Sequence, residues 1–168
     1  MPYDSVPFYD MNDNETGCCP RFNPKDWDGL ELHFDNKLFV RAVTHAVFHV
    51  PIDMGKVFQR VQDHLEAVNA FDPNDFFILS KDLGAWTSEH FFTASREVPG
   101  EDMVRLSGDY VTKVFDGPYS EAKDWYDQMK ALAAARGNPD GEVYFYYTTC
   151  PKCAQHYGHN YVVGFAQA

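Results

Sequence analysis

The apolar and polar residues of the chain divide it into alternating and helical stretches. From Met103 onward the residues alternate as in a half-buried strand, until Asp116-Gly117-Pro118 ends the ladder. Apolar residues then recur at helical spacing from Tyr119 to Ala133, with Ser120 as candidate N-cap and Gly137 as the glycine that closes the helix. Strands are predicted over 142–148 and 161–167. The second half therefore predicts the order strand, helix, strand, strand.

The same order is predicted once before in the chain. Strands over 38–50, 76–80 and 89–98 accompany a helix over 53–68, in which Val57, Val61, Leu65 and Val68 form the apolar stripe. Each copy is a sheet with one helix and is too small to bury its apolar face alone, so the two copies should pair. The predicted fold is α+β: a tandem repeat forming an antiparallel sheet, with two helices on one side and a cleft on the pseudo-twofold axis.

The predicted domain organisation separates the first 37 residues from the rest. Residues 1–37 form an N-terminal arm that holds a Cys-Cys-Pro motif and a candidate extra strand over Trp27 to Phe34, and residues 1–15 are polar with little periodicity. Residues 38–168 form the domain, with repeat halves 38–98 and 103–168.

Several motifs of the second half carry a family resemblance. They are Ser107-Gly108-Asp109-Tyr110, Phe115-Asp116-Gly117-Pro118-Tyr119, Trp125 and Glu142-Val143-Tyr144. In this arrangement the chain resembles the GyrI-like small-molecule-binding family, whose members serve as effector-binding domains, as gyrase inhibitors and as hydrolases of cyclopropane-containing toxins. Since no helix-turn-helix segment precedes the domain, the resemblance implies a stand-alone protein that binds amphipathic or aromatic, including cationic, small molecules. The alternative is a hydrolase that uses the same cleft.

All four cysteines lie in two short motifs, Cys18-Cys19-Pro20-Arg21-Phe22 and Cys150-Pro151-Lys152-Cys153. These motifs resemble a bacterial and archaeal branch described as hydrolases. Two residues between Cys150 and Cys153 allow both thiolates to face one ion, so the cofactor prediction is a structural zinc held by these two with Cys18 and Cys19. His156 and His159 are reserve ligands, because adjacent cysteines seldom bind one ion together.

Two other roles for the cysteines stay open at this point. One is a redox-active Cys-x-x-Cys, and the other is a set of inert reduced thiols in a tight turn. The thioredoxin-type motif opens a helix between strands, whereas this sequence predicts a loop between two strands at that position.

Strand parity selects the candidate ligand-binding residues. His45 and His49 share one face of the first strand, although strand histidines are more often structural hydrogen-bonding groups. Glu142, Tyr144 and Tyr146 share a face of a later strand, and the resemblance matches Glu142 to the pocket carboxylate of multidrug binders. Glu97 is its counterpart in the first copy, and Trp86 lies in a loop at the rim. The catalytic candidates are Glu97, Glu142 and Tyr144, as an acid–base pair of carboxylates with a polarising phenol. The alternative for both Glu97 and Glu142 is that each is a solvated residue at the end of a strand.

Composition excludes several classes of function. The chain has 168 residues, a net charge of −11 and 45% hydrophobic residues, which is typical of a globular protein without a nucleic-acid partner. It shows no membrane-length apolar run and no signal-peptide pattern, so a cytoplasmic location without a membrane partner is predicted. Serine-hydrolase elbows, phosphate-binding glycine loops and His-Glu-x-x-His metal motifs are missing from the sequence. Aromatic residues make up 16%, which suits a small organic ligand held by stacking.

Overall fold

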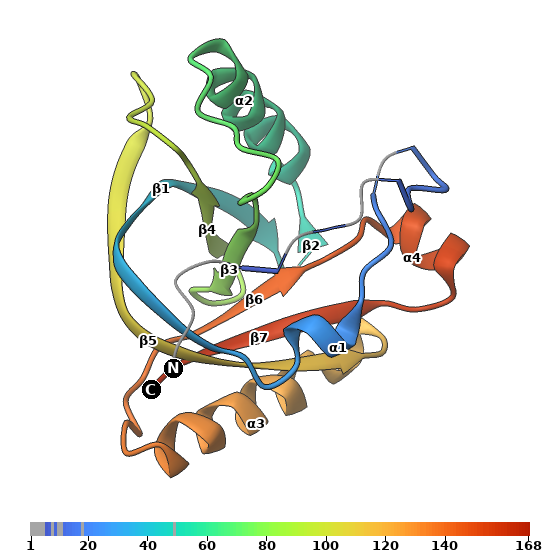
Figure 1. The fold of residues 1–168 in the computed structure, drawn as a ribbon, viewed down its shortest axis with the longest axis vertical. Coiled ribbons are helices and arrows are strands. Elements are labelled where there is room, and N and C mark those ends of the chain that lie inside the picture. Colours follow the sequence, from blue (N-terminus) through green and yellow to red (C-terminus); the bar gives the residue numbers. More distant parts are fainter. Residues whose placement is uncertain (1–5, 8, 10–11, 18, 49) are drawn as a thin grey trace. The chain divides into compact units, whose positions relative to one another are not determined.

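The computed structural model describes residues 6–7, 9, 12–17, 19–48 and 50–168, and it divides them into two compact units. The first unit comprises the residues up to Phe34 together with Gly108–Ala168, and the second unit is Asp35–Ser107. Two long strands, β1 (Glu31–Val47) and β5 (Asp102–Asp116), each contribute residues to both units (Figure 1). Among the described residues, no helix combines the length and apolar character that crossing a membrane requires.

The first unit is an antiparallel sheet with a helix on one face. Strand β7 (Tyr161–Gln167) pairs antiparallel with both β5 and β6 (Val143–Tyr147). The connections contain a 3₁₀ turn, η1 (Tyr119–Glu121), and two helices, α3 (Ala122–Ala135) and α4 (Pro151–Tyr157). A short helix, α1 (Pro24–Trp27), precedes β1.

Helix α3 covers one face of this sheet, because its apolar stripe packs against the alternate strand residues that point to that face. Trp125, Met129 and Ala133 of α3 are buried against residues of the sheet that include Val143 and Phe145. Gly164 permits the close approach, since a Cβ at this position would lie 2.6 Å from the Met129 sulfur. The helix ends as predicted, with Gly137 at a positive φ of 89°.

The opposite face of the same sheet is covered by aromatic side chains of the N-terminal segment, which here means the described residues from Val6 to Phe34. Trp27 is 2% exposed, and its ring centroid lies 5.3 Å from that of Tyr146 and 6.4 Å from that of Phe165. Phe22 packs 5.9 Å from Trp27. The backbone is fixed as well, because the Thr112 hydroxyl donates to the Trp27 carbonyl and the Leu30 amide donates to Thr112 Oγ1 at 3.0 Å. The N-terminal segment is therefore part of the hydrophobic core of the first unit.

The second unit also consists of an antiparallel sheet and one helix. Strand β4 (Thr87–Thr93) pairs antiparallel with β1 and with β3 (Ile78–Asp82), and β2 (Val50–Pro51) pairs with the end of β1. Helix α2 (Met54–Ala67) buries its predicted stripe of Val57, Val61 and Leu65 in a core that includes Val40 and Phe92.

A buried polar triad lies in the sheet of the second unit. His90 is 2% exposed, and its ring nitrogens lie 2.7 Å from the Ser80 hydroxyl and 2.8 Å from the Thr44 hydroxyl. The Phe58 ring of α2 approaches it edge-on, with centroids 4.9 Å apart. Burial lowers the pKa of His90 to about 4, against the weaker opposing effect of Asp82 and other carboxylates. The imidazole is therefore neutral at pH 7.

The triad around His90 predicts that the stability of the folded protein depends on pH. Because the folded pKa of His90 is depressed, the unfolded chain takes up the proton first, and stability falls as the pH drops from about 6.5 toward about 4. The full loss attributable to this one group is about 3 kcal/mol. Urea unfolding of His90→Gln should show a smaller difference in the free energy of unfolding between about pH 7 and about pH 4.5 than the wild type does. An equal difference in both proteins would assign the acid sensitivity to other groups.

The antiparallel α/β architecture is confirmed, and three local predictions are wrong. Ser120 is not the N-cap of α3, because it lies inside η1 and Glu121 occupies the cap position without a side-chain cap bond. Trp27 to Phe34 is not one strand, since Asn23-Pro24 starts a helix there: the Asn23 side chain accepts from the Lys25 amide. Cys150 and Cys153 do not lie in a loop but at the start of α4. The pseudo-twofold repeat and the cleft on its axis stay predictions.

Candidate metal centre

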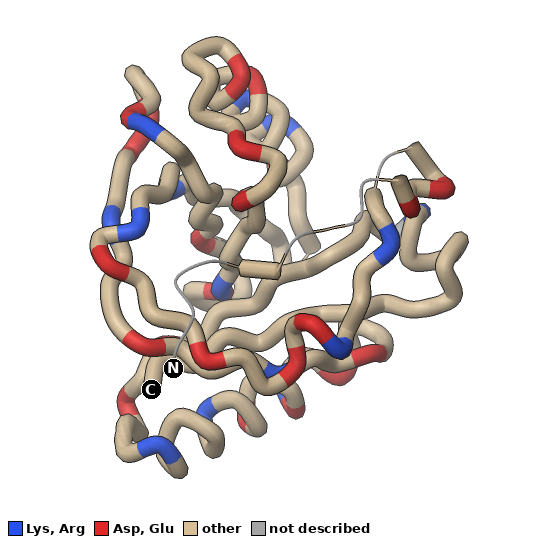
Figure 2. The backbone as a smooth tube through the Cα atoms, in the orientation of Figure 1, with Lys and Arg blue, Asp and Glu red and all other residues tan. Residues whose placement is uncertain are grey.

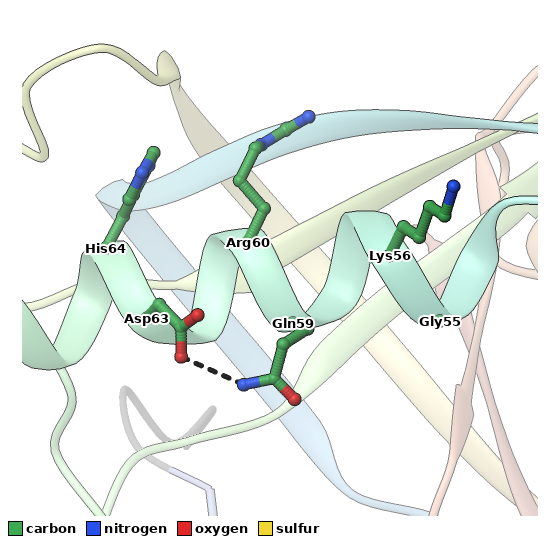
Figure 3. A pocket seen from close by; sticks show the side chains of 6 residues that line it. All are labelled: Gly55, Lys56, Gln59, Arg60, Asp63 and His64. Atoms are coloured by element: carbon green, nitrogen blue, oxygen red, sulfur yellow. Dashed lines mark hydrogen bonds between the residues drawn. The ribbon is translucent and has the colours of Figure 1, made fainter.

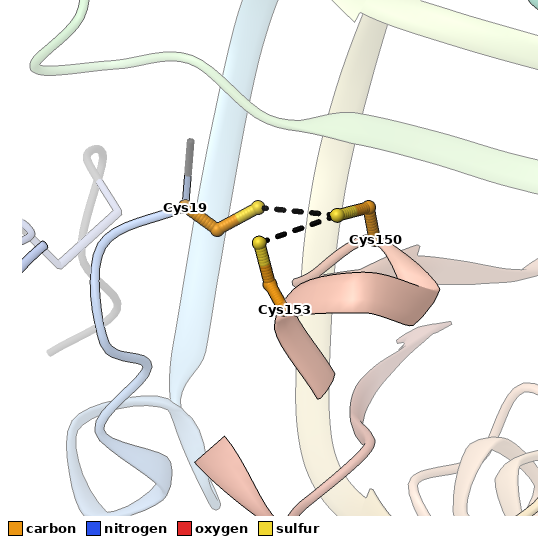
Figure 4. A group of neighbouring side chains, drawn as sticks. All are labelled: Cys19, Cys150 and Cys153. Carbon is orange, nitrogen blue, oxygen red and sulfur yellow. Dashed lines mark hydrogen bonds between the residues drawn. The ribbon is translucent and has the colours of Figure 1, made fainter. Parts of the chain in front are cut away.

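Three cysteine sulfurs meet at the start of α4 in the first unit. Cys19 comes from the N-terminal segment, Cys150 is the N-cap of α4 and Cys153 lies in its first turn. The three sulfurs lie within 4.8 Å of one another and could hold a metal ion (Figure 4). Cys153 is buried, Cys19 is intermediate and Cys150 is exposed, so the cluster is closed on the core side and open on one side.

The separations of the sulfurs are suited to tetrahedral coordination. The Cys19 and Cys150 sulfurs are 3.9 Å apart, and the Cys150 and Cys153 sulfurs are 3.2 Å apart. Zn–S bonds of about 2.3 Å at tetrahedral angles place two sulfurs about 3.8 Å apart. Thiolate-rich sites select soft or borderline ions such as zinc. Small movements of Cys150 and Cys153 would therefore complete three corners of a tetrahedron.

Hydrogen bonds hold the N-terminal side of the cluster in place. The Thr16 hydroxyl lies 3.3 Å from the Cys153 sulfur and accepts from the Cys19 amide at 3.2 Å. From the other side, the Tyr157 hydroxyl of α4 donates to the Cys19 carbonyl at 2.7 Å. The backbone on both sides of the Cys19 side chain is thus fixed before any ion binds.

Charged groups add a second attachment between the N-terminal segment and α4. His156 Nε2 lies 2.9 Å from a Glu15 carboxylate oxygen, and the Arg21 guanidinium lies over the Tyr157 ring at 4.6 Å. Arg21 also forms an ion pair with Glu15 at 2.8 Å. The hydrogen bond with His156 and the charge of Arg21 lower the pKa of Glu15. His156, a predicted reserve ligand, is therefore engaged with a carboxylate.

Two phenols lie behind the cluster. The Tyr9 and Tyr146 hydroxyl oxygens are 2.6 Å apart. Burial and, more weakly, the nearby Cys19 raise the pKa of Tyr146 to about 12, against the opposing effect of the hydrogen bond with Tyr9. Burial, Tyr146 and Cys19 also raise the pKa of Tyr9. Both phenols therefore stay protonated, and one of them donates to the other.

The structure brings together three of the four predicted ligands. Cys18 lies outside the described residues. His159, the other reserve ligand, has its Nδ1 2.7 Å from an Asp116 carboxylate oxygen and lines a depression of about 420 Å³ that also includes Asn160 and Gly158. The hydroxyl of Thr16 and the phenol of Tyr9 were missed by sequence reasoning, because they precede any periodic segment, whereas Tyr146 was predicted as a ligand-binding residue.

The predicted ligand-binding residues of the first unit lie on the face that the N-terminal segment covers. Tyr144 and Tyr146 are 5% and 8% exposed, and Tyr144 packs 6.4 Å from the Tyr110 ring. Glu142 is exposed just before β6, and it contributes with burial to raising the pKa of Tyr110 to about 12.

The predicted residues of the second unit are mostly exposed. His45 Nδ1 lies 2.7 Å from an Asp53 carboxylate oxygen, and His49 lies outside the described residues. Trp86 is 53% exposed, with its ring centroid 5.0 Å from that of Phe48. Glu97 lies 3.6 Å from Arg105, in an exposed ion pair.

A second depression, of about 540 Å³, lies along α2. Lys56, Arg60 and His64 point to one side of the helix in Figure 3, while Gln59 and Asp63 form a hydrogen bond at 2.8 Å. Arg60 and His64 both bind the nearly buried carboxylate of Glu101, at 3.1 and 2.7 Å. This basic row is thus largely neutralised. Figure 2 shows Asp and Glu spread along the chain rather than gathered on one element.

Comparison with protein families gives a match over most of the chain. The family model described as "Bacterial hydrolase" matches residues 9–168, a range that includes Cys19, Cys150 and Cys153. No curated protein and no solved structure matches the chain. The resemblance of the second half to the GyrI-like family stays a prediction. Because the match spans nearly the whole sequence, the chain belongs to this bacterial hydrolase family.

Proposed function

We propose that the protein is a metal-dependent hydrolase of small molecules, with zinc bound by Cys19, Cys150 and Cys153. The proposal rests on the number of cysteine ligands in the cluster and on their exposure. Among the described residues three sulfurs converge, and the outermost, Cys150, is exposed. Structural zinc sites are closed by four protein ligands, whereas catalytic sites keep one position open. The family description supports the same reaction class.

The chain's own residues would divide the work between holding the ion and orienting the substrate. When bound, zinc supplies Lewis acidity at its open coordination position. Thr16 and Tyr157 keep Cys19 oriented, as outer partners of metal ligands do. The Tyr9 phenol, which is half-buried and paired with the buried Tyr146, would be the donor to an oxygen that gains negative charge, because it remains protonated.

Cobalt substitution tests the open position directly. Cobalt(II)-loaded protein should show the charge-transfer and visible bands of a tetrahedral thiolate site, and these bands should shift when a small zinc-binding inhibitor such as acetohydroxamate is added. Bands that do not shift on adding the inhibitor would indicate a closed, structural site in which Cys18 or another group supplies the fourth ligand.

Hydrolysis itself is tested with a panel of ester, amide, lactone and cyclopropane-bearing compounds. Zinc-loaded wild type should turn over at least one of them, and Cys150→Ser should reduce the rate by at least about 100-fold. Lys152→Ala, an exposed change in the same helical turn, is the matched control and should retain the rate. Equal turnover by the Cys150→Ser variant and the wild type would place catalysis elsewhere.

A second candidate function is binding of planar or amphipathic small molecules without turnover. The exposed ring pair of Trp86 and Phe48 in the second unit favours it, since such pairs stack on flat organic guests. Tryptophan fluorescence should then change on adding a cationic aromatic dye, and the change should be lost in Trp86→Ala. A dye response that survives this substitution would exclude the ring pair as the binding surface.

A further inference from the structure

The position of the Cys-x-x-Cys motif at the start of α4 bears on redox chemistry as well as on metal binding. Cys150 is the N-cap and Cys153 lies in the first turn of α4, which joins the antiparallel strands β6 and β7, so the Cys-x-x-Cys motif opens a helix as redox-active motifs do. Their sulfurs are 3.2 Å apart, closer than the 3.9 Å between the sulfurs of Cys19 and Cys150. We propose that Cys150 is an oxidation site, and that its disulfide with Cys153 switches the metal centre off.

Exposure decides which sulfur reacts first. Cys150 is exposed and its side chain does not cap the helix, whereas Cys153 is 2% exposed and lies against the Thr16 hydroxyl. A small oxidant from solvent therefore meets Cys150. Cys153 then acts as the resolving cysteine, because it is in contact with Cys150 and belongs to the same helical turn.

The reaction balances with hydrogen peroxide as the oxidant. The Cys150 sulfur attacks one peroxide oxygen, the O–O bond breaks, and a sulfenic acid and one water form. The Cys153 sulfur then attacks the Cys150 sulfur, the S–O bond breaks, and a disulfide and a second water form. The two sulfurs together lose two electrons and two protons, and the peroxide is reduced to two waters.

The disulfide would remove two of the three ligands from the proposed zinc site. Cys19 alone cannot hold the ion, so oxidation should release it, and reduction by a dithiol should restore the site. The second sulfur contact of Cys150, with Cys19 at 3.9 Å, is longer and joins residues 131 positions apart. The local pair is therefore the expected product. The effect on activity rests on the proposed hydrolase, but formation of the disulfide does not.

The experiment treats the zinc-loaded full-length protein with a slight excess of hydrogen peroxide. Intact mass spectrometry should show the loss of two hydrogen atoms, peptide mapping should link Cys150 to Cys153, and a chromogenic chelator should detect about one released zinc per chain. Dithiothreitol should reverse all three changes. The same mapping on metal-free protein tests the disulfide independently of zinc.

Two serine variants complete the test. Cys153→Ser should lose the linked peptide and gain labelling of Cys150 by a sulfenic-acid probe. Cys19→Ser, the matched control, should keep the Cys150–Cys153 link. A main product that joins Cys150 to Cys18 or Cys19, or the absence of any disulfide in the wild type, would overturn the inference. If the link forms but no zinc was bound beforehand, only the proposed metal centre fails.

Discussion

Removal of the metal is expected to lower the melting temperature of the protein by about 10 °C. An ion present at about 1,000 times its dissociation constant stabilises the folded state by about 4 kcal/mol. In a chain of this length each kcal/mol corresponds to about 2–4 °C. The loss follows because the cluster joins the N-terminal segment to α4, and the sulfurs of Cys19 and Cys150 come together only in the folded state.

Calorimetry with and without a strong chelator measures this effect. Elemental analysis of protein purified without a metal-affinity tag should give about one zinc per chain. Cys153→Ser should melt at a lower temperature and respond weakly to chelator, whereas Lys152→Ala should behave as the wild type does. Metal-free wild-type protein that melts at the same temperature as zinc-loaded protein would mean that the cluster does not contribute to stability through an ion.

Replacement of Trp27 by alanine is expected to destabilise the protein by about 3–5 kcal/mol, the usual cost of truncating a buried large aromatic residue. Trp27 is 2% exposed and packs against rings from three parts of the first unit, Phe22, Tyr146 and Phe165. The substitution leaves a cavity that these rings cannot fill, because each is fixed by its own strand or loop.

Trp86→Ala is the matched control, since this tryptophan is 53% exposed. Its removal should cost about 1 kcal/mol or less. Chemical unfolding of both variants, monitored by circular dichroism, compares their losses in the free energy of unfolding under one condition. Similar losses would mean that the N-terminal segment contributes no more to stability than an exposed loop does.

The periodic segments were predictable because local sequence determines them. The stripe of Val57, Val61 and Leu65 specifies α2, and β7 has the predicted limits because its apolar residues are bounded by turn residues on the N-terminal side. The start of α3 was not predictable in the same way. Pro118 favours a 3₁₀ turn before the helix, and no side chain caps α3.

The candidate site was predictable only in part. The sequence indicates that the two cysteine motifs form one site, because all the cysteines lie in them. It does not reveal the roles of Tyr9, Thr16 and Tyr157, because these contacts depend on how the N-terminal segment packs against the rest of the first unit. Strand parity placed Tyr144 and Tyr146 on one face correctly. It could not show that the same face is covered by Trp27, because α1 is too short to leave a periodic signal.

The discontinuity of the first unit determines the order in which the protein can fold during synthesis. The second unit is one continuous stretch, Asp35–Ser107, and is complete once that stretch has left the ribosome. The N-terminal segment is made before the second unit, but it must wait for β6, α4 and β7, which are made after that unit. Until then Trp27 lacks its partners in β6 and β7, and Cys19 lacks its partners in α4. Between the synthesis of Trp27 and that of Phe165, the nascent chain therefore carries apolar side chains without their native cover, which favours binding by chaperones that recognise such segments.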